Sequence, residues 1–299
     1  MAKTKVEFVC RECGASHHQW AGQCLDCKEW NTLEEIVISQ ATSSKPESLK
    51  DLPASKVQNL TEIKAQNKDR LSTGLSELDR TLGGGLVDGS VVLIGGDPGI
   101  GKSTLILQAL AKLNSDNTTL YVSGEESAEQ VSERAIRLGI KEDILFIGET
   151  HLEKIIKLSK DIKPKVIVID SIQTMVTDLS ASAPGSVTQV RDCAAQLTQF
   201  AKQTNTILLM IGHVTKGGAL AGPRILEHMV DAVLYFEGDA GGRYRIIRAV
   251  KNRFGAVNEI SVFAMGEKGL QQVSNPSSIF LSNQENPSSG SMVMVTREA

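Results

Sequence analysis

A short glycine-rich stretch has the residue types and spacing needed to hold a nucleoside triphosphate. Residues 96–103 match the pattern G-x-x-x-x-G-K-[ST]. The glycines allow backbone N–H groups to face a phosphate, Lys102 brings positive charge to the β- and γ-phosphates, and the Ser103 hydroxyl can ligate Mg²⁺. The predicted nucleotide-binding residues are Gly95, Gly96, Asp97, Pro98, Gly99, Ile100, Gly101, Lys102, Ser103 and Thr104.

The segments on either side of this stretch have the order that the motif requires. The apolar run 90–94 is typical of a buried parallel strand, and 105–113 has the pattern of a helix. In this order the positive N-terminal end of the helix lies behind a bound anion. The context therefore favours a phosphate-binding loop over a chance glycine turn before a helix.

A second apolar run ends in a carboxylate. Residues 166–169 are Val-Ile-Val-Ile, and Asp170 follows them. In phosphoryl-transfer enzymes an aspartate in this position supports the Mg²⁺ ion that accompanies the phosphates. The alternative is a plain carboxylate at a strand end, but the phosphate-binding motif upstream favours the metal-supporting role.

Two pairs of cysteines near the N-terminus have the spacing of a metal site. Each pair has the form C-x-x-C, and ten residues separate the pairs. Four thiolates so arranged suit a structural, tetrahedral Zn²⁺ ion, which would provide much of the folding free energy of so short a unit. A redox dithiol or free thiols are the alternatives, and His17 and His18 are interpreted as surface residues. The predicted zinc ligands are Cys10, Cys13, Cys24 and Cys27.

The composition is that of a globular chain without a membrane span. The 299 residues carry a net charge of −3, with 41% hydrophobic and 22% charged residues. A strongly basic, broadly nucleic-acid-binding surface is excluded, so any such site must be a local patch. No apolar run approaches the roughly 18 residues of a membrane span, and the N-terminus lacks the apolar region of a signal peptide. We expect a cytoplasmic chain with no membrane partner, in which the fifth cysteine, Cys193, is a small core residue.

Strand and helix patterns alternate through the middle of the chain. Few aromatic residues and many Val, Ile, Leu and Gly residues favour a buried parallel sheet. Three late strand patterns, 230–236, 244–250 and 258–263, follow one another through short turns and predict an antiparallel part. The expected fold is α/β, with a mixed, mainly parallel sheet flanked by helices. Ser76 and Asp79 predict a capped helix before the phosphate loop.

These patterns divide the chain into four parts. Residues 1–35 form the predicted zinc finger, and residues 36–60 form a polar linker without a hydrophobic period. Residues 61–272 contain the strands and helices of the core. Residues 273–299 include a further apolar run, as though another domain begins there.

The order of these parts resembles the bacterial RadA/Sms family of DNA-repair ATPases, within the RecA-like superfamily. The resemblance rests on the four-cysteine finger, on the phosphate loop paired with Asp170, and on two further stretches. These stretches are Leu71-Ser72-Thr73-Gly74-Leu75 with Glu77-Leu78-Asp79, and Lys251-Asn252-Arg253-Phe254-Gly255. The resemblance runs from residue 8 to about residue 296 and implies a RecA-like core followed by the start of an incomplete Lon-protease-like domain.

This resemblance implies an ATP-driven motor on single-stranded DNA that promotes branch migration during homologous recombination. The implied partners are single-stranded and branched DNA, the RecA recombinase and further copies of the same chain in a ring, which we expect to be a hexamer. The implied cofactors are ATP, Mg²⁺ and Zn²⁺. A nucleotide-switched recombination mediator without translocation is the alternative. A replicative-type helicase is disfavoured, because such proteins lack the finger and the 251–255 motif.

The resemblance also implies catalytic roles for single residues. The carboxylate after the second strand should activate water, with Glu125 as the first choice and Glu126 as the alternative. Strand-end carboxylates beside the phosphate loop can reach the attacking water, which supports this role. Lys102 and Asp170 would act on the phosphates and on Mg²⁺. His213, which ends another predicted strand, is expected to sense the γ-phosphate, with a core histidine as the alternative.

Lys251 and Arg253 are expected to complete the site of a neighbouring subunit. In the superfamily, cations at these positions reach the γ-phosphate bound by the next subunit, as arginine fingers do. Contact with DNA and a solvated basic edge strand are the alternatives. The spacing of Lys251 and Arg253 places them on one face of a strand, as it does Arg243 and Arg245, and Arg248 adds to this cluster.

Two loops resemble the DNA-binding loops of RecA-like proteins. They span residues 176–186 and 213–223 and leave the ends of neighbouring predicted strands. Their cations are few, with Lys216 inside one loop and Arg191 and Arg224 nearby. Backbone N–H groups and repetition around a ring would therefore have to supply DNA affinity. Plain flexible loops are the alternative.

Overall fold

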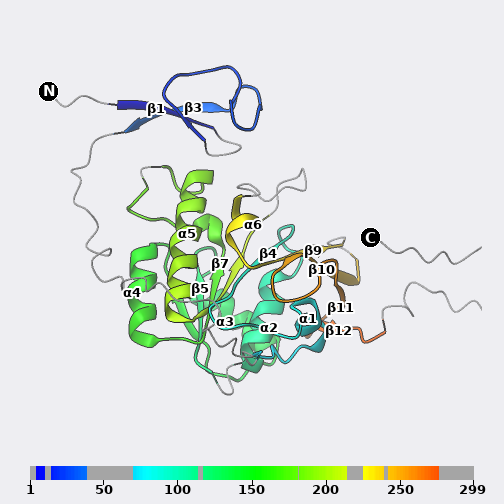
Figure 1. Ribbon diagram of the computed structural model, residues 1–299. Coiled ribbons are helices and arrows are strands. Elements are labelled where there is room, and N and C mark those ends of the chain that lie inside the picture. The colour runs from blue at the N-terminus through cyan, green and yellow to red at the C-terminus, as the bar shows by residue number, and fades with distance from the viewer. Residues whose placement is uncertain are drawn as a thin grey trace, which may run out of the picture.

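Two sheets organise the chain (Figure 1). The computed structural model describes residues 5–10, 15–38, 70–113, 117–180, 182–213, 225–238 and 242–275. The N-terminal part holds a three-stranded sheet, and the rest of these residues build a nine-stranded sheet with its helices.

The N-terminal sheet lies beside the predicted metal site. Its strands are β1 (Lys5–Cys10), β2 (Ser16–His17) and β3 (Leu33–Ile38), in the order β2-β1-β3. Both outer strands pair antiparallel with β1, and its last residue, Cys10, is paired with Leu33. Because β3 runs to Ile38, regular structure extends three residues into the segment predicted as a linker.

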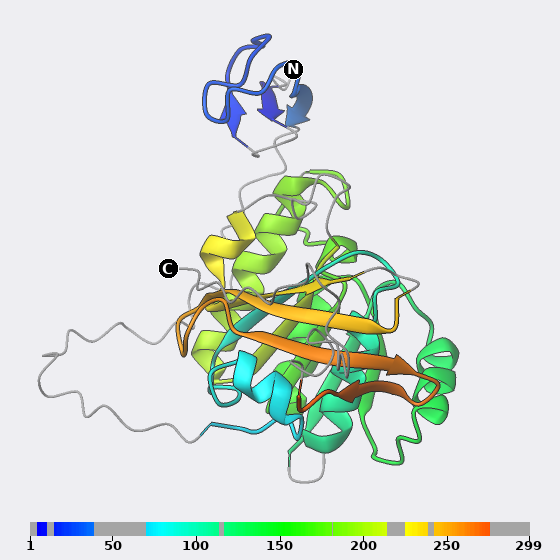
Figure 2. The same cartoon turned by 90° about the vertical axis from the view of Figure 1, so that its right-hand side faces the viewer.

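The nine-stranded sheet has the order β12-β11-β10-β9-β4-β8-β7-β5-β6. Neighbouring strands from β9 to β6 in this order run parallel, whereas β9, β10, β11 and β12 pair antiparallel. The predicted α/β fold with a mixed, mainly parallel sheet is confirmed. The antiparallel strands form one edge, which faces the viewer in Figure 2. The strands are β4 (Val91–Gly95), β5 (Thr119–Ser123), β6 (Leu145–Gly148), β7 (Val166–Asp170), β8 (Ile207–Ile211), β9 (Ala232–Glu237), β10 (Tyr244–Asn252), β11 (Ile260–Gly266) and β12 (Gly269–Gln272).

Helices pack on both faces of this sheet (Figure 1). In β4, Val92 and Ile94 belong to the apolar cluster that contains α2, whereas Val91 and Leu93 belong to the cluster that contains α5. This alternation buries both faces of a central strand, as expected for parallel strands. The helices are α1 (Ser76–Thr81), α2 (Lys102–Leu113), α3 (Ala128–Arg137), α4 (Leu152–Ile162), the short 3-10 helix η2 (Ile172–Thr174), α5 (Val187–Thr204) and α6 (Ile225–Met229).

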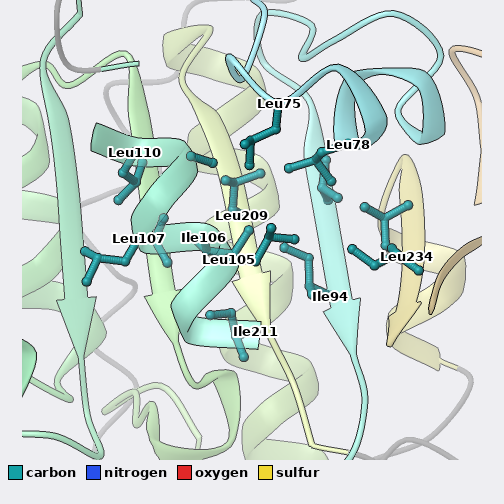
Figure 3. Close-up of a cluster of buried hydrophobic side chains, with 14 of the residues drawn as sticks. Leu75, Leu78, Ile94, Leu105, Ile106, Leu107, Leu110, Leu209, Ile211 and Leu234 are labelled. Atoms are coloured by element: carbon teal, nitrogen blue, oxygen red, sulfur yellow. The ribbon is translucent and has the colours of Figure 1, made fainter. Parts of the chain in front are cut away.

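Leucine and isoleucine side chains of α2 fill the space between that helix and the sheet. Figure 3 shows Leu105 and Ile106 of α2 beside Ile94 of β4 and Leu209 of β8. These residues are almost fully buried, so the helix that follows the phosphate loop is fixed to the strand that precedes it. No helix within the described residues has the length and apolar character needed to cross a membrane.

α1 begins differently from its predicted cap. Its N-cap residue is Leu75, whose side chain makes no capping hydrogen bond, and the backbone N–H of Glu77 donates to the side-chain oxygen of Gln272 at 2.8 Å. Instead, the carboxylate of Asp79 accepts hydrogen bonds from the backbone N–H of Thr73 at 2.8 Å and from the Ser72 hydroxyl at 2.6 Å. The predicted capping pair of Ser76 and Asp79 is therefore wrong, because Asp79 orders the segment that leads into the helix.

The turn after β10 packs closely against the glycine loop that follows α1. A Cβ added to Gly83, whose φ is +80°, would lie 2.8 Å from the Cα atom of Gly255. The side-chain amide of Asn252 donates to the carbonyl oxygen of Thr81 at 3.3 Å. The 251–255 motif and the glycine loop are thus parts of one packed unit, although they are far apart in the sequence.

A buried carboxylate joins the start of the central strands to this turn. Asp231 directly precedes β9, and its side chain is only 4% exposed. It accepts hydrogen bonds from the backbone N–H of Val91 at 3.0 Å, from the Lys202 ammonium and from the Arg253 guanidinium at 3.2 Å. A buried carboxylate is tolerated only when it is paired in this way.

Replacing Asp231 by alanine should lower the free energy of unfolding by about 1–3 kcal/mol, because the backbone N–H of Val91 loses its buried partner. Urea denaturation of the full chain measures this change. The matched control is Glu259→Ala, which removes an exposed partner of Arg80 and should change stability by less than about 0.5 kcal/mol. Equal effects of the two substitutions would contradict the assigned role of Asp231.

Candidate active site and metal centre

A cavity of about 280 Å³ lies at the carboxyl ends of strands β4, β5, β7 and β8. In an open parallel sheet, ligands bind at the carboxyl ends of the strands. The phosphate loop, the residues after β5, the last residue of β7 and the α3 helix all contribute to it. The lining residues are Pro98, Gly99, Gly101, Lys102, Ser103, Thr104, Glu125, Glu126, Arg134, Arg137, Asp170 and His213.

The phosphate loop closes around the side chain of Lys102. This lysine begins α2, is 4% exposed, and donates to the carbonyl oxygens of Gly96 at 2.7 Å and Asp97 at 2.8 Å. Burial lowers the pKa of Lys102 to about 8, and the nearby carboxylates of Asp170 and Glu125 oppose that shift. The ammonium group therefore remains largely protonated at neutral pH, as a phosphate ligand must be.

Glycine is required where this loop leaves β4. Gly96 has φ +151°, and a Cβ there would lie 2.8 Å from the Cβ of Phe236 on β9. Strand β9 thus leaves no room for a side chain at position 96. Such close packing allows loop N–H groups to approach a bound phosphate.

Asp170 lies at the end of β7 and is 5% exposed. Burial raises the pKa of its carboxyl group, and hydrogen bonds from the hydroxyls of Tyr121 and Ser103 lower it. Hydroxyl and carboxylate oxygens are ligands that Mg²⁺ accepts, usually together with water and phosphate oxygens. Ser103 and Asp170 therefore fit the predicted magnesium-supporting pair.

The structure distinguishes clearly between the two candidate carboxylates after β5. Glu125 Oε1 accepts a hydrogen bond from the Ser171 hydroxyl and lies 2.9 Å from His213 Nε2. The contact with His213 lowers the pKa of Glu125, and the Ser171 hydrogen bond adds to this effect, while burial opposes it. Glu126 instead forms a two-point ion pair with Arg134 of α3. Glu125 is therefore ionised and available to the cavity, whereas Glu126 is committed to a structural contact.

A close contact behind Glu125 fixes its backbone. The N–H of Gly124 donates to the carbonyl oxygen of Asp170 at 2.9 Å. A Cβ on Gly124 would lie 2.1 Å from the Thr174 hydroxyl oxygen, so only glycine fits at this position. Glu125 is thus held beside the end of β7 by the packing of two neighbouring strands.

The predicted metal ligands converge at the N-terminal sheet. The sulfur atoms of Cys10, Cys24 and Cys27 lie within 4.8 Å of one another, and those of Cys10 and Cys27 are 3.6 Å apart. Four sulfurs around one tetrahedral zinc would be roughly 3.8 Å apart, given a Zn–S bond of about 2.3 Å. The arrangement fits a tetrahedral metal site, whose fourth predicted ligand, Cys13, lies outside the described residues.

His17 belongs to this cluster and is not the surface residue that the sequence predicts. Its side chain is 12% exposed, and its Nε2 atom lies 3.4 Å from Cys24 Sγ and 3.5 Å from Asp26 Oδ2. His18, by contrast, is exposed. The rings of Trp20 and Trp30, which are 60% and 68% exposed, both lie within 4.0 Å of the position that a Cβ on Gly22 would take.

Known proteins resemble the chain over both of its parts. Residues 58–219 match a family model described as an AAA domain, and residues 8–35 match one described as a rubredoxin metal binding domain. The DNA repair protein RadA of Pseudomonas aeruginosa is 56% identical over 299 residues. Those of Haemophilus influenzae and Bacillus subtilis are 51% and 48% identical over 303 and 302 residues. Each alignment covers 100% of this chain and 66% of the relative.

The chain belongs to the RadA family. Its core belongs to the AAA domain family, since that model matches more than half of the chain. The chain thus spans about two thirds of the length of the RadA proteins that it matches, and this share includes the metal-binding unit and the phosphate loop.

In this RadA-family chain, Lys251 and Arg253 lie far from the cavity. Neither lines it: the Lys251 ammonium donates to the carbonyl oxygen of Glu227 at 2.5 Å, and Arg253 pairs with Asp231. Asp231 N–H donates to the carbonyl of Val91, at the start of the strand whose end begins the phosphate loop. The five residues of β4 thus separate the cavity from Asp231 and Arg253. At about 3.3 Å per residue this is roughly 16 Å.

The prediction that Lys251 and Arg253 share one face of a strand is wrong. A register shift between Ala249 and Lys251 interrupts β10, which ends at Asn252, so Arg253 follows the strand. Their proximity arises instead because both side chains contact the segment that runs from α6 into β9.

Arg245 has a role that the predicted basic cluster misses. It is 2% exposed, and its guanidinium donates to the carbonyl oxygen of Ile100 in the phosphate loop at 2.9 Å. Ile247 and Ala249, at alternate positions of the same strand, are also buried, and this alternation could have revealed that Arg245 points inward. Arg248, on the other face, pairs with Glu237. The predicted cluster is thus divided between the two faces of β10.

The two predicted DNA-binding loops are described to different extents. Of 176–186, all residues except 181 are described, and Thr177 within it is buried against Glu153 of α4. Leu179 of the same loop is 60% exposed. Residues 214–223 lie outside the described residues, so the second loop remains a prediction from the sequence.

We expect the purified chain to carry about one metal ion, which Cys24→Ser should remove, because that buried thiol belongs to the cluster. Elemental analysis of the intact chain measures the metal content. Cys193→Ser is the matched control, since burial in α5 raises the pKa of the Cys193 thiol to about 12 and keeps it away from metal chemistry. Retention of the metal by Cys24→Ser would contradict the site.

Proposed function

We propose that this chain is an ATP hydrolase acting in DNA repair, with its hydrolytic site in the cavity at the carboxyl ends of the parallel strands. The observation that carries the proposal is the placement of Glu125. Its ionised carboxylate lines the same cavity as Lys102 and Asp170, and hydroxyl and imidazole contacts hold it in place. A phosphate-binding loop alone indicates binding, whereas a positioned carboxylate beside it provides for attack by water.

Different residues of the cavity would have different roles in phosphoryl transfer. The loop N–H groups and Lys102 would hold the phosphates, and Ser103 and Asp170 would hold Mg²⁺, which neutralises phosphate charge. Glu125 would orient water and accept its proton, a role that requires the ionised form favoured by its lowered pKa. His213, at hydrogen-bond distance from Glu125, can couple that carboxylate to the state of the γ-phosphate.

For the metal-binding unit we propose Zn²⁺. Thiolate ligands select soft or borderline metals, and a closed set of four would leave no position for a substrate. The unit would therefore be structural. Its described core contains few buried side chains, with Leu33 beside the cysteines, so metal ligation would supply much of its stability.

We further propose that hydrolysis drives movement on single-stranded DNA and branch migration, together with the RecA recombinase. The relatives are named DNA repair protein RadA, which supports a role in repair, and the motor function extends the resemblance seen in the sequence. Hydrolysis that single-stranded DNA accelerates, combined with displacement of an annealed strand, tests this proposal. A rate that does not respond to DNA would favour a nucleotide-switched mediator.

A ring of subunits, with a hexamer as the expected form, would complete each site. Lys251 and Arg253 lie at the opposite end of the sheet from the cavity of their own chain, which supports action on a neighbour's nucleotide. In a head-to-tail ring the two ends of successive subunits meet.

Glu125→Gln should reduce ATP turnover by at least about 100-fold while nucleotide binding persists, because it removes the group that activates water. Turnover and binding of a fluorescent nucleotide measure the two effects separately. Glu126→Gln is the matched control and should retain most activity, since Glu126 pairs with Arg134. The reverse order of effects would assign the role to Glu126.

Mixing two inactive variants tests the shared site. Lys102→Ala lacks the phosphate-binding lysine and Lys251→Ala lacks the proposed cation in trans, so each alone should be inactive. In randomly mixed rings, up to about one quarter of the interfaces would combine two intact halves, and activity should return. A mixture of Lys102→Ala with the Lys102→Ala/Lys251→Ala double variant should stay inactive, because every subunit then lacks the phosphate-binding lysine. If Lys251→Ala alone hydrolyses ATP at the wild-type rate, its role lies elsewhere, for example on DNA.

A further inference from the structure

A tyrosine hydroxyl lies inside an otherwise apolar region behind the candidate active site. Tyr121 of β5 is 0% exposed and belongs to the apolar cluster between the sheet and α2. Its ring stacks on Phe146 of β6, with centroids 6.4 Å apart and an interplanar angle of 17°. Burying a tyrosine hydroxyl without a hydrogen-bond partner is unfavourable. A partner for this hydroxyl therefore explains why tyrosine occupies position 121.

That partner is the carboxylate of Asp170. The Tyr121 hydroxyl donates to Asp170 Oδ2 within the buried region. The parallel pairing of β5 with β7 places Tyr121 opposite Val168, so the tyrosine lies two residues before the level of Asp170. Side chains two residues apart on a strand share a face, and the long tyrosine side chain reaches the aspartate along that face.

The hydrogen bond has a defined direction. Burial and the nearby Asp170 charge raise the pKa of Tyr121 well above its ordinary value, so the hydroxyl keeps its proton and acts as a donor. Asp170 Oδ2 accepts this hydrogen bond. Phenylalanine would fill almost the same volume but would leave Oδ2 without this donor.

We propose that Tyr121 is a positioning residue that fixes the Asp170 carboxylate and thereby sets how tightly the site holds Mg²⁺ with the nucleotide. With Oδ2 held by the hydroxyl, the carboxylate cannot rotate freely, and it remains aligned with Ser103 at the cavity wall. Loss of a group that orients a metal ligand in this way typically lowers metal affinity about 10- to 100-fold. This inference rests on the proposed function, because it assigns Asp170 to the metal.

Tyr121→Phe in the full chain tests the proposal. Binding of a fluorescent adenosine diphosphate, titrated with Mg²⁺, should require roughly tenfold more Mg²⁺ for half-maximal effect, as expected when a ligand loses its orienting partner. Binding measured in excess chelator should not change, because the loop and Lys102 are intact. The Mg²⁺ dependence of ATP turnover should shift in the same direction.

Phe146→Leu is the matched control. It removes the ring that stacks on Tyr121 but leaves the hydroxyl and Asp170 in place. Its Mg²⁺ midpoint should equal that of the wild type even if its melting temperature falls. Equal midpoints for Tyr121→Phe and the wild type, or the same shift in Phe146→Leu, would overturn the proposal.

The two readouts separate this inference from the proposed hydrolysis. A wild-type chain that binds the nucleotide with Mg²⁺ but does not hydrolyse ATP would refute the proposed activity, while the midpoint comparison would still decide the role of Tyr121. A wild-type chain whose nucleotide binding ignores Mg²⁺ would overturn the role of Tyr121, whatever its hydrolysis rate.

Discussion

The burial of two opposite charges, Lys102 and Asp170, shapes the site at the end of the central strands. Burial lowers the pKa of the lysine and raises that of the aspartate, so it shifts each group toward its neutral form. Their mutual attraction, the loop carbonyls around the lysine and the hydroxyls of Tyr121 and Ser103 around the aspartate oppose this tendency. The strands and α2 must therefore pack with little freedom, which the apolar clusters on both faces of the sheet ensure.

The sheet also keeps two sets of charges apart. The cavity occupies the carboxyl ends of the parallel strands, whereas Asp231 gathers Lys202 and Arg253 at the other end. Because the strands of the sheet are extended, its two ends cannot approach each other within one chain. This separation supports the proposal that the site is completed between subunits, because assembly would bring one chain's cations to the next chain's phosphates.

Features set by local sequence were predictable. The phosphate loop, Asp170 and the alternating strands and helices follow from spacing and hydrophobic period, and the sheet and its antiparallel part match those patterns. The features that the sequence left open depend on contacts between distant segments. Glu125 and Glu126 are adjacent in sequence, and only their separate partners, His213 and Arg134, distinguish them.

Long-range pairing likewise explains what the sequence did not reveal at single residues. Nothing near Tyr121 in the sequence points to Asp170, because their contact arises from the register of β5 against β7. His17 approaches Cys24 because the metal-binding unit folds back on itself.

The two tryptophans of the entire chain, Trp20 and Trp30, lie in the metal-binding unit, at its surface. The indole emission of the whole protein thus originates outside the ATPase core, so excitation at wavelengths that tyrosine does not absorb follows the small unit by fluorescence in the intact molecule.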